Sequence, residues 1–284
     1  MVLSGTSMYV GASVGVLLFD AFPPAAVAWL RVAVSALVIV ALVRPRKAAW
    51  RGRRLLLAAG FGVVTALMNI CFYESIARLP LGTAVAIEFL GPIAVVAYAS
   101  RSARGVASLV AAGAGVAFIA DVQFAGEPLG VAFALLAAAF WAGYVVLGKV
   151  VAGTTDSMSS LAVGWTVAAV VTSPLLISVL HQDTRSESLV RVASMVLALA
   201  VLSSVIPYLL DQQVLRMVGR GRFALLLALL PVAAVGAGFL MLRQVPSRVE
   251  LIGIALVIGA LIVSERPAQT VPLRPADRTG GGPA

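Results

Sequence analysis

The sequence predicts an all-α polytopic membrane protein with ten transmembrane helices in two inverted five-helix repeats. Three observations predict this fold class. The 284-residue chain is 61% hydrophobic and only 12% charged, whereas soluble domains have roughly 45–50% apolar and 25% charged residues. Apolar runs that approach the roughly 20 residues needed to span a bilayer recur along the whole length. The two halves of the chain also show a weak similarity to each other.

Each apolar run is interpreted as a helix, because helices satisfy their own backbone groups in lipid and the runs lack the alternation of barrel strands. The ten predicted spans are approximately 3–20, 25–43, 55–77, 81–100, 105–121, 128–148, 159–180, 191–213, 222–242 and 248–264. After Ser264 the chain is rich in Pro, Gly and Arg, which predicts a disordered cytoplasmic tail. The expected boundaries are 1–123 for the first repeat, 124–264 for the second and 265–284 for the tail.

The distribution of basic residues predicts the orientation. With the N-terminus inside, the cytoplasmic connections and the tail hold 15 of the 21 Lys and Arg residues, and the outer connections hold five. This positive-inside bias predicts that both termini are cytoplasmic. The expected location is the inner or plasma membrane. The net charge of +9 then reflects orientation, so the expected partner is the lipid bilayer and not a nucleic acid. One cysteine and one histidine predict no disulfide framework, metal site or cofactor.

The internal similarity is centred on two prolines. FYESIARLPLGTAVAIEFLGPIAVV, around the third and fourth spans, aligns with PYLLDQQVLRMVGRGRFALLLALLPVAAV, around the eighth and ninth, when Pro92 is set against Pro231. Because five is an odd number, the second copy enters the membrane from the opposite side. Many secondary transporters share this plan and bind their solute near the midplane between the repeats.

Three charged residues are expected at similar depths in the outer half of the membrane. At 1.5 Å per residue, Arg31 lies about 9 Å from the outer edge, Glu88 about 10 Å and Glu74 about 6 Å. We expect an Arg31–Glu88 ion pair, with Glu74 beside Arg78 at i,i+4. A static clamp between helices is the alternative interpretation. A functional role is preferred because ionisable residues inside membranes usually serve function.

Prolines within the predicted spans indicate interrupted helices. Pro92 excludes a hydrogen bond to the Glu88 carbonyl, and Pro207 similarly frees the carbonyl of Ser203. Interrupted helices bind polar solutes where they face a cavity, although prolines are also simply common in membrane helices. Asp211 could line an inward-facing vestibule or contact Arg216 at the interface. The candidate pathway residues are Arg31, Asn69, Tyr73, Glu74, Glu88, Pro92, Trp141, Tyr144, Tyr208 and Asp211.

The stretch FYESIARLPLGTAVAIEFLGP resembles the signature of threonine/homoserine-type exporters, within the EamA branch of the drug/metabolite transporter superfamily. WAGYVVLG, SSVIPYLLD and the closing VELIGIALVIGALIVS resemble further family stretches. The resemblance implies ten helices in two inverted repeats and export of amino acids or related metabolites. It departs at Leu230–Pro231, where relatives carry Glu-Pro, and at Arg243–Gln244, where they carry Gly-Glu.

We therefore expect a secondary active transporter that exports a small-molecule solute, an amino acid or related metabolite, by alternating access. No nucleotide-binding motif is present, so an ion gradient, with the proton as the candidate coupling ion, or the gradient of the solute itself is expected to drive it. The hypothesis is that Glu88, paired with Arg31, couples solute binding to rocking of the repeats. The alternatives are a drug or nucleotide-sugar carrier of the same fold, a lipid-modifying intramembrane enzyme and a non-transporting scaffold. The enzyme is disfavoured because a His-Asp or metal-ligand constellation is missing.

Overall fold

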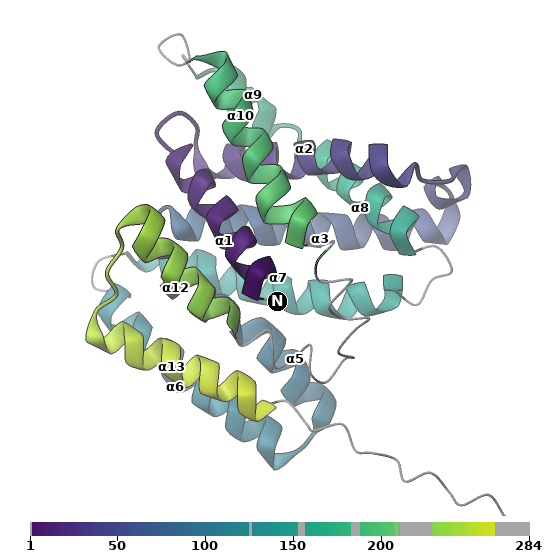
Figure 1. Ribbon diagram of the computed structural model, residues 1–284. Helices are drawn as coiled ribbons and strands as arrows, with labels where there is room; N and C mark the ends of the chain where they lie inside the picture. The colour runs from purple at the N-terminus through teal and green to yellow at the C-terminus, as the bar shows by residue number, and fades with distance from the viewer. Residues whose placement is uncertain are drawn as a thin grey trace, which may run out of the picture.

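The computed structural model describes residues 2–124, 127–152, 157–182, 188–207, 210 and 229–264. Every regular element in these residues is a helix, which confirms the predicted fold class (Figure 1). The elements are α1 (Val2–Leu17), α2 (Pro24–Val43), η1 (Lys47–Trp50), α3 (Gly52–Ile76), α4 (Leu81–Glu88), α5 (Leu90–Ser100), α6 (Ala103–Phe124), α7 (Pro128–Ala152), α8 (Ser157–Val171), α9 (Leu175–Leu180), α10 (Leu189–Ala200), η3 (Val201–Val205), α12 (Leu229–Leu242) and α13 (Arg248–Ser264).

The predicted spans correspond to these helices one by one, with the fourth, seventh and eighth each divided into two elements. Parts of the eighth and ninth spans fall outside the described residues. Within the described chain, four helical stretches are long and apolar enough to cross a bilayer: Pro24–Val43, Gly52–Ile76, Leu81–Ala99 and Pro128–Val151. Five further apolar helices are shorter.

Prolines and arginines mark several helix ends. Pro24 and Pro128 are the first residues of α2 and α7, where proline costs little because a first-turn amide has no partner within the helix. Three helices end at an arginine in the left-handed region: Arg44 after α2 (φ 49°), Arg101 after α5 (φ 45°) and Arg243 after α12 (φ 55°). Glycine usually occupies this position, because a side chain is strained there.

The packing partners repeat when the two halves are exchanged. The fifth and tenth spans, α6 and α13, pack side by side (Figure 1), and so do the second and seventh, α2 and α8. The α3–α7 contact is matched by the contact of α1 with α10 and η3. The α1–α12 contact is matched by α7 against α4 and α5. The fold is therefore built from two repeats of five spans, while their exact boundaries stay a prediction.

The fourth span is broken in the middle. Phe89 separates α4 from α5, and Pro92 lies three residues further along. Pro92 has no amide hydrogen to donate to the Glu88 carbonyl, which accounts for a break at this point. A Cβ on Gly91 would collide with the carbonyl oxygen of Ala138, so glycine allows α5 to lie directly against α7. The break therefore places Glu88 at the end of a short helix inside the bundle.

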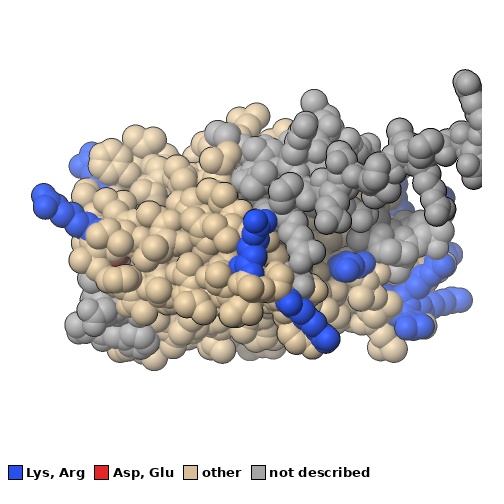
Figure 2. All heavy atoms as spheres, turned by 90° about the horizontal axis from the view of Figure 1, so that it is seen from below, with Lys and Arg blue, Asp and Glu red and all other residues tan. Residues whose placement is uncertain are grey.

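The outer surface is suited to lipid. Large apolar side chains are exposed, including Leu37 at 71%, Leu56 at 73% and Leu240 at 78%. An exposed apolar surface of this extent needs a hydrocarbon environment. Figure 2 shows a described surface that is mostly tan, with Lys and Arg side chains at the left, in the middle and, as a larger group, at the right-hand end of the view. The low density of charge over most of this face suits a membrane-embedded bundle.

Candidate functional site

Arg31 forms the polar centre of the bundle. Its Nη1 donates a hydrogen bond to Asn69 Oδ1 at 2.6 Å, its Nη2 to the Ser203 carbonyl at 2.9 Å and its Nε to Ser204 Oγ at 3.1 Å. The amide of Asn69 is fixed in turn, because its Nδ2 donates to the Thr65 carbonyl at 2.7 Å. Arg31 on α2 thus connects α3 of the first half with η3 of the second.

A break in the regular helix supplies two of these three acceptors. Val201–Val205 form a π-helical turn, in which the Ile206 amide donates to the Val201 carbonyl, five residues back. Pro207 follows directly and cannot donate to the Ser203 carbonyl, as expected from the sequence. That carbonyl instead accepts from Arg31. Turns of this kind are frequent at functional sites.

Two tyrosines surround the guanidinium. The ring of Tyr73 lies 5.8 Å from the Arg31 guanidinium carbon, at cation–π distance. Tyr73 is fully buried, and its hydroxyl lies beside Arg31 and Ser203, although it makes no hydrogen bond of standard geometry with the described residues. Tyr9 on α1 is buried too, and lies close enough to Arg31 and Glu88 to interact electrostatically with both. Nothing in the sequence pattern singled out Tyr9, since a tyrosine in the first span also suits an interfacial anchor.

Glu88 and Arg31 do not form the predicted ion pair. The two charges interact electrostatically, yet no nitrogen of Arg31 comes within the 4.0 Å of Glu88 that defines a salt bridge. Glu88 is only 7% exposed, and none of the described residues donates a hydrogen bond to it. The prediction was wrong because the depth of two residues along their helices does not fix the direction in which their side chains point. Arg31 uses neutral acceptors instead.

Glu74 has structural partners. Its Oε2 lies 2.7 Å from Arg78 Nη1, which is the i,i+4 pair expected from the sequence. Its Oε1 accepts a hydrogen bond from the Ala25 amide at 3.1 Å. This amide belongs to the first turn of α2, where a negative charge stabilises the helix. Glu74 therefore ties α3 to the start of α2, and it makes no hydrogen bond or ion pair with Arg31 or Glu88.

The aromatic candidates are distributed over the bundle. Trp141 packs edge-on against Phe89, the residue at the break of the fourth span, with 4.7 Å between ring centroids. Tyr144 packs against Phe61 of α3 with 4.9 Å between centroids. Tyr208 and Asp211 lie outside the described residues. Trp141 is therefore the aromatic candidate next to the Glu88 segment. Tyr144 contacts α3 at Phe61, away from the site residues Asn69 and Tyr73 of the same helix.

Glu250 is a buried carboxylate that the sequence analysis missed. It is 4% exposed, and its Oε1 accepts a hydrogen bond from Thr83 Oγ1 at 2.8 Å. Its Oε2 accepts from the Ser247 amide at 2.7 Å, and its own amide donates to Ser247 Oγ at 3.2 Å. This reciprocal arrangement is a capping box. The S-x-x-E spacing of Ser247 and Glu250 before an apolar run was the signal that could have found it.

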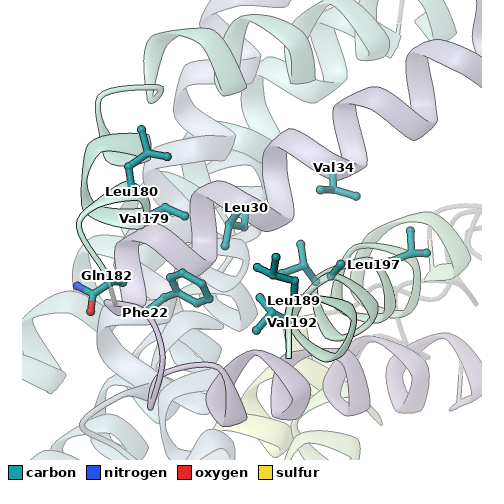
Figure 3. A pocket seen from close by; sticks show the side chains of 11 residues that line it. Phe22, Leu30, Val34, Val179, Leu180, Gln182, Leu189, Val192 and Leu197 are labelled. Atoms are coloured by element: carbon teal, nitrogen blue, oxygen red, sulfur yellow. The ribbon is translucent and has the colours of Figure 1, made fainter. Parts of the chain in front are cut away.

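A cavity of about 570 Å³ lies between α2, α9 and α10 (Figure 3). Of the eleven lining residues only Gln182 is polar, and Leu30 and Val34 form its α2 wall. Such a lining suits hydrocarbon and offers few groups to a charged solute. The polar centre at Arg31 is a different place, although Leu30 is its neighbour in the chain. We therefore assign the candidate site to Arg31, Asn69, Tyr73, Glu88 and Ser204.

Comparisons with known proteins agree with this architecture. The model of the EamA-like transporter family matches residues 128–265. Threonine/homoserine exporter RhtA of Escherichia coli (strain K12) is 30% identical over 264 residues, which cover 92% of this chain and 88% of the relative. The exporter of the same name from Salmonella typhimurium (strain SL1344) is 29% identical over 266 residues, with the same coverage.

One solved structure agrees over nearly the same length. A crystal structure of another protein superposes with a TM-score of 0.57 over 93% of this chain and 94% of that one, at 16% identity, and supports the fold alone. The sequence relatives are exporters, and so the protein is a transporter and not an enzyme. The chain belongs to the EamA-like transporter family.

Proposed function

We propose that the protein exports neutral amino acids of the threonine/homoserine class, or closely related metabolites, by alternating access of its two repeats. The named function of the relatives supports the solute class. The contact of Arg31 with both halves supports a solute site between the repeats. The positive-inside bias supports an orientation with cytoplasmic termini, and the named export function of the relatives supports the direction of transport.

The observation that carries the proposal is a half-buried cation that is bound by neutral groups. Among the described residues, Arg31 is held by an amide, a hydroxyl and a carbonyl and forms no ion pair. A guanidinium has five N–H donors, and these three contacts use three of them. Two donors and a full positive charge are left for the carboxylate of a solute, which guanidinium groups bind well.

Glu88 supplies the opposite charge. An amino acid is a zwitterion, so its carboxylate binds Arg31 and its ammonium group binds Glu88, which lies beyond ion-pair distance of Arg31. The hydroxyl of Tyr73, buried beside Arg31, is available to the hydroxyl of a threonine-like side chain. Release of the solute leaves Glu88 free to take up a proton, which couples export to the proton gradient.

Counterflow in proteoliposomes tests this function. Liposomes that contain the purified protein are loaded with unlabelled threonine, and the uptake of labelled threonine or homoserine is followed. Unlabelled threonine outside should compete, while threonine amide, which lacks the carboxylate, and 3-hydroxybutyrate, which lacks the amine, should not. Competition by a hydrophobic drug or a nucleotide sugar, without competition by threonine, would support the rival carriers instead.

Replacement of the two charges separates their roles. Glu88→Gln should abolish accumulation driven by a pH gradient, and Arg31→Gln should abolish counterflow. Size-exclusion chromatography should show that both variant proteins are folded. Glu74→Gln is the matched control, because this carboxylate contacts Ala25 and Arg78 and not the site. Unchanged transport in Glu88→Gln would reduce that residue to a structural role.

A further inference from the structure

A second polar cluster joins the two repeats at the start of α4, and the transport site does not use it. Thr83 of α4 donates to Glu250 of α13 at 2.8 Å. Gln244, in the connection between α12 and α13, accepts from the Leu81 amide at 2.9 Å through its Oε1. Thr83 is 1% exposed and Glu250 is 4% exposed. We call Thr83, Gln244 and Glu250 the gate residues.

The carboxylate of this cluster has no counterpart at the corresponding position of the first repeat. α5 and α12 both end at a left-handed arginine, and Ser102 and Ser247 then cap the next helix by accepting from the amide three residues on. That third residue is Gly105 in the first repeat and Glu250 in the second. The first repeat therefore lacks a carboxylate where the second repeat binds α4.

The position of the cluster along α4 connects it to the candidate site. Glu88 follows Thr83 by five residues on the same eight-residue helix, a distance of about 7.5 Å along the axis. Nearby, Gly82 lies directly against Val235 of α12. The contact is so close that a Cβ at Gly82 would collide with the Val235 side chain. Contacts from the second repeat thus hold α4, and with it Glu88, in one position.

We propose that the gate residues close the α4 end of the transport pathway, and that Glu250 is a positioning residue whose hydrogen bond to Thr83 must break each time this end opens. By the predicted orientation this is the outer end. Both contacts to α4 are formed in this structure, so this end is closed here.

The test measures opening directly and needs no transport. A Cys71→Ala background removes the one cysteine, and Val235→Cys places a reporter at the α4–α12 contact. The full-length protein is reconstituted in nanodiscs, where a hydrophilic maleimide reaches both faces. Thr83→Val removes the hydroxyl and keeps the side-chain shape, while Thr83→Ser keeps the hydroxyl. The loss of one hydrogen bond to a charged group should accelerate labelling about tenfold in Thr83→Val and little in Thr83→Ser.

Ser247→Ala is the matched control, because it weakens the capping box within the second repeat and leaves the Thr83 contact in place. It should lower the melting temperature without accelerating labelling. Gln244→Ala provides a second route, and it should accelerate labelling as Thr83→Val does. Equal labelling rates in Thr83→Val, Gln244→Ala and the parent would overturn the proposal. Acceleration by Ser247→Ala as large as that by Thr83→Val would also overturn it, since the effect would then reflect stability alone.

Discussion

The amide oxygen of Asn69 accepts a hydrogen bond of 2.6 Å from the guanidinium of Arg31, and Asn69 is buried between α2 and the rest of the bundle. A neutral amide orients the guanidinium without cancelling its charge. The same position occupied by a carboxylate would have satisfied Arg31 more strongly. The pairing is therefore consistent with a cation that is held in place but left available to an anionic group.

Asn69→Asp should give Arg31 a permanent salt-bridge partner. The new carboxylate would lie at ion-pair distance and compete with the solute, so the initial rate of threonine counterflow should fall at least about tenfold, as expected for a partly buried ion pair. The melting temperature in detergent should stay the same or rise. Transport at the parental rate would show that the charge of Arg31 does not need to be available.

Glu74→Ala should weaken the fold and spare solute recognition. It removes the partner of Arg78 and of the Ala25 amide, so the free energy of unfolding should fall by about 1–3 kcal/mol. The KM for threonine should not change, because Glu74 makes no contact with Arg31 or Glu88. Chemical denaturation and counterflow measure the two effects separately. An increase in the KM for threonine with unchanged stability would show instead that Glu74 takes part in solute binding.

Gly91→Ala should destabilise the protein through the α5–α7 contact. The added methyl group collides with the Ala138 carbonyl, and overpacking of this kind costs about 1–3 kcal/mol. Gly60→Ala is the control, since a Cβ at Gly60 in α3 meets nothing within 4 Å. Thermal unfolding of both variants in the same detergent gives the comparison. Equal melting temperatures would mean that α5 and α7 can separate without cost.

Arg243→Gly should stabilise the protein. Arg243 has a φ of 55°, a conformation that costs an L-residue about 1–2 kcal/mol and glycine little. Arg243→Ala removes the same side chain but keeps the strain, and it should bring no gain. A melting temperature that rises equally in both variants would assign the effect to the lost charge.

Much of the fold could be predicted from the sequence, because a membrane span is recognised by the length and the hydrophobicity of one continuous stretch of chain. The apolar runs located α2, α3 and α7 to within a few residues, and helical spacing predicted the Glu74–Arg78 pair. Proline chemistry predicted that the Ser203 carbonyl would be free of its helical partner, and it accepts from Arg31. Each of these inferences uses distance along a single helix.

The rest depends on how helices face each other, which the sequence does not encode so simply. The predicted Arg31–Glu88 pair failed because two residues at one depth can point in different directions. Glu250 was overlooked because a capping box is a local signal, while the importance of Glu250 comes from Thr83, 167 positions away. The π-turn at Val201–Val205 has no hydrophobic pattern of its own.

That π-turn constrains the length of the eighth span as well as its composition. A π-turn holds one residue more than an α-helix over the same stretch. Deletion of a single codon between Val201 and Val205 would remove this extra residue and close the turn into an ordinary α-helix. Ser203 and Ser204 could then no longer both face α2, and Arg31 would lose two of its three acceptors. In this segment a one-residue gap should harm the protein more than most single replacements.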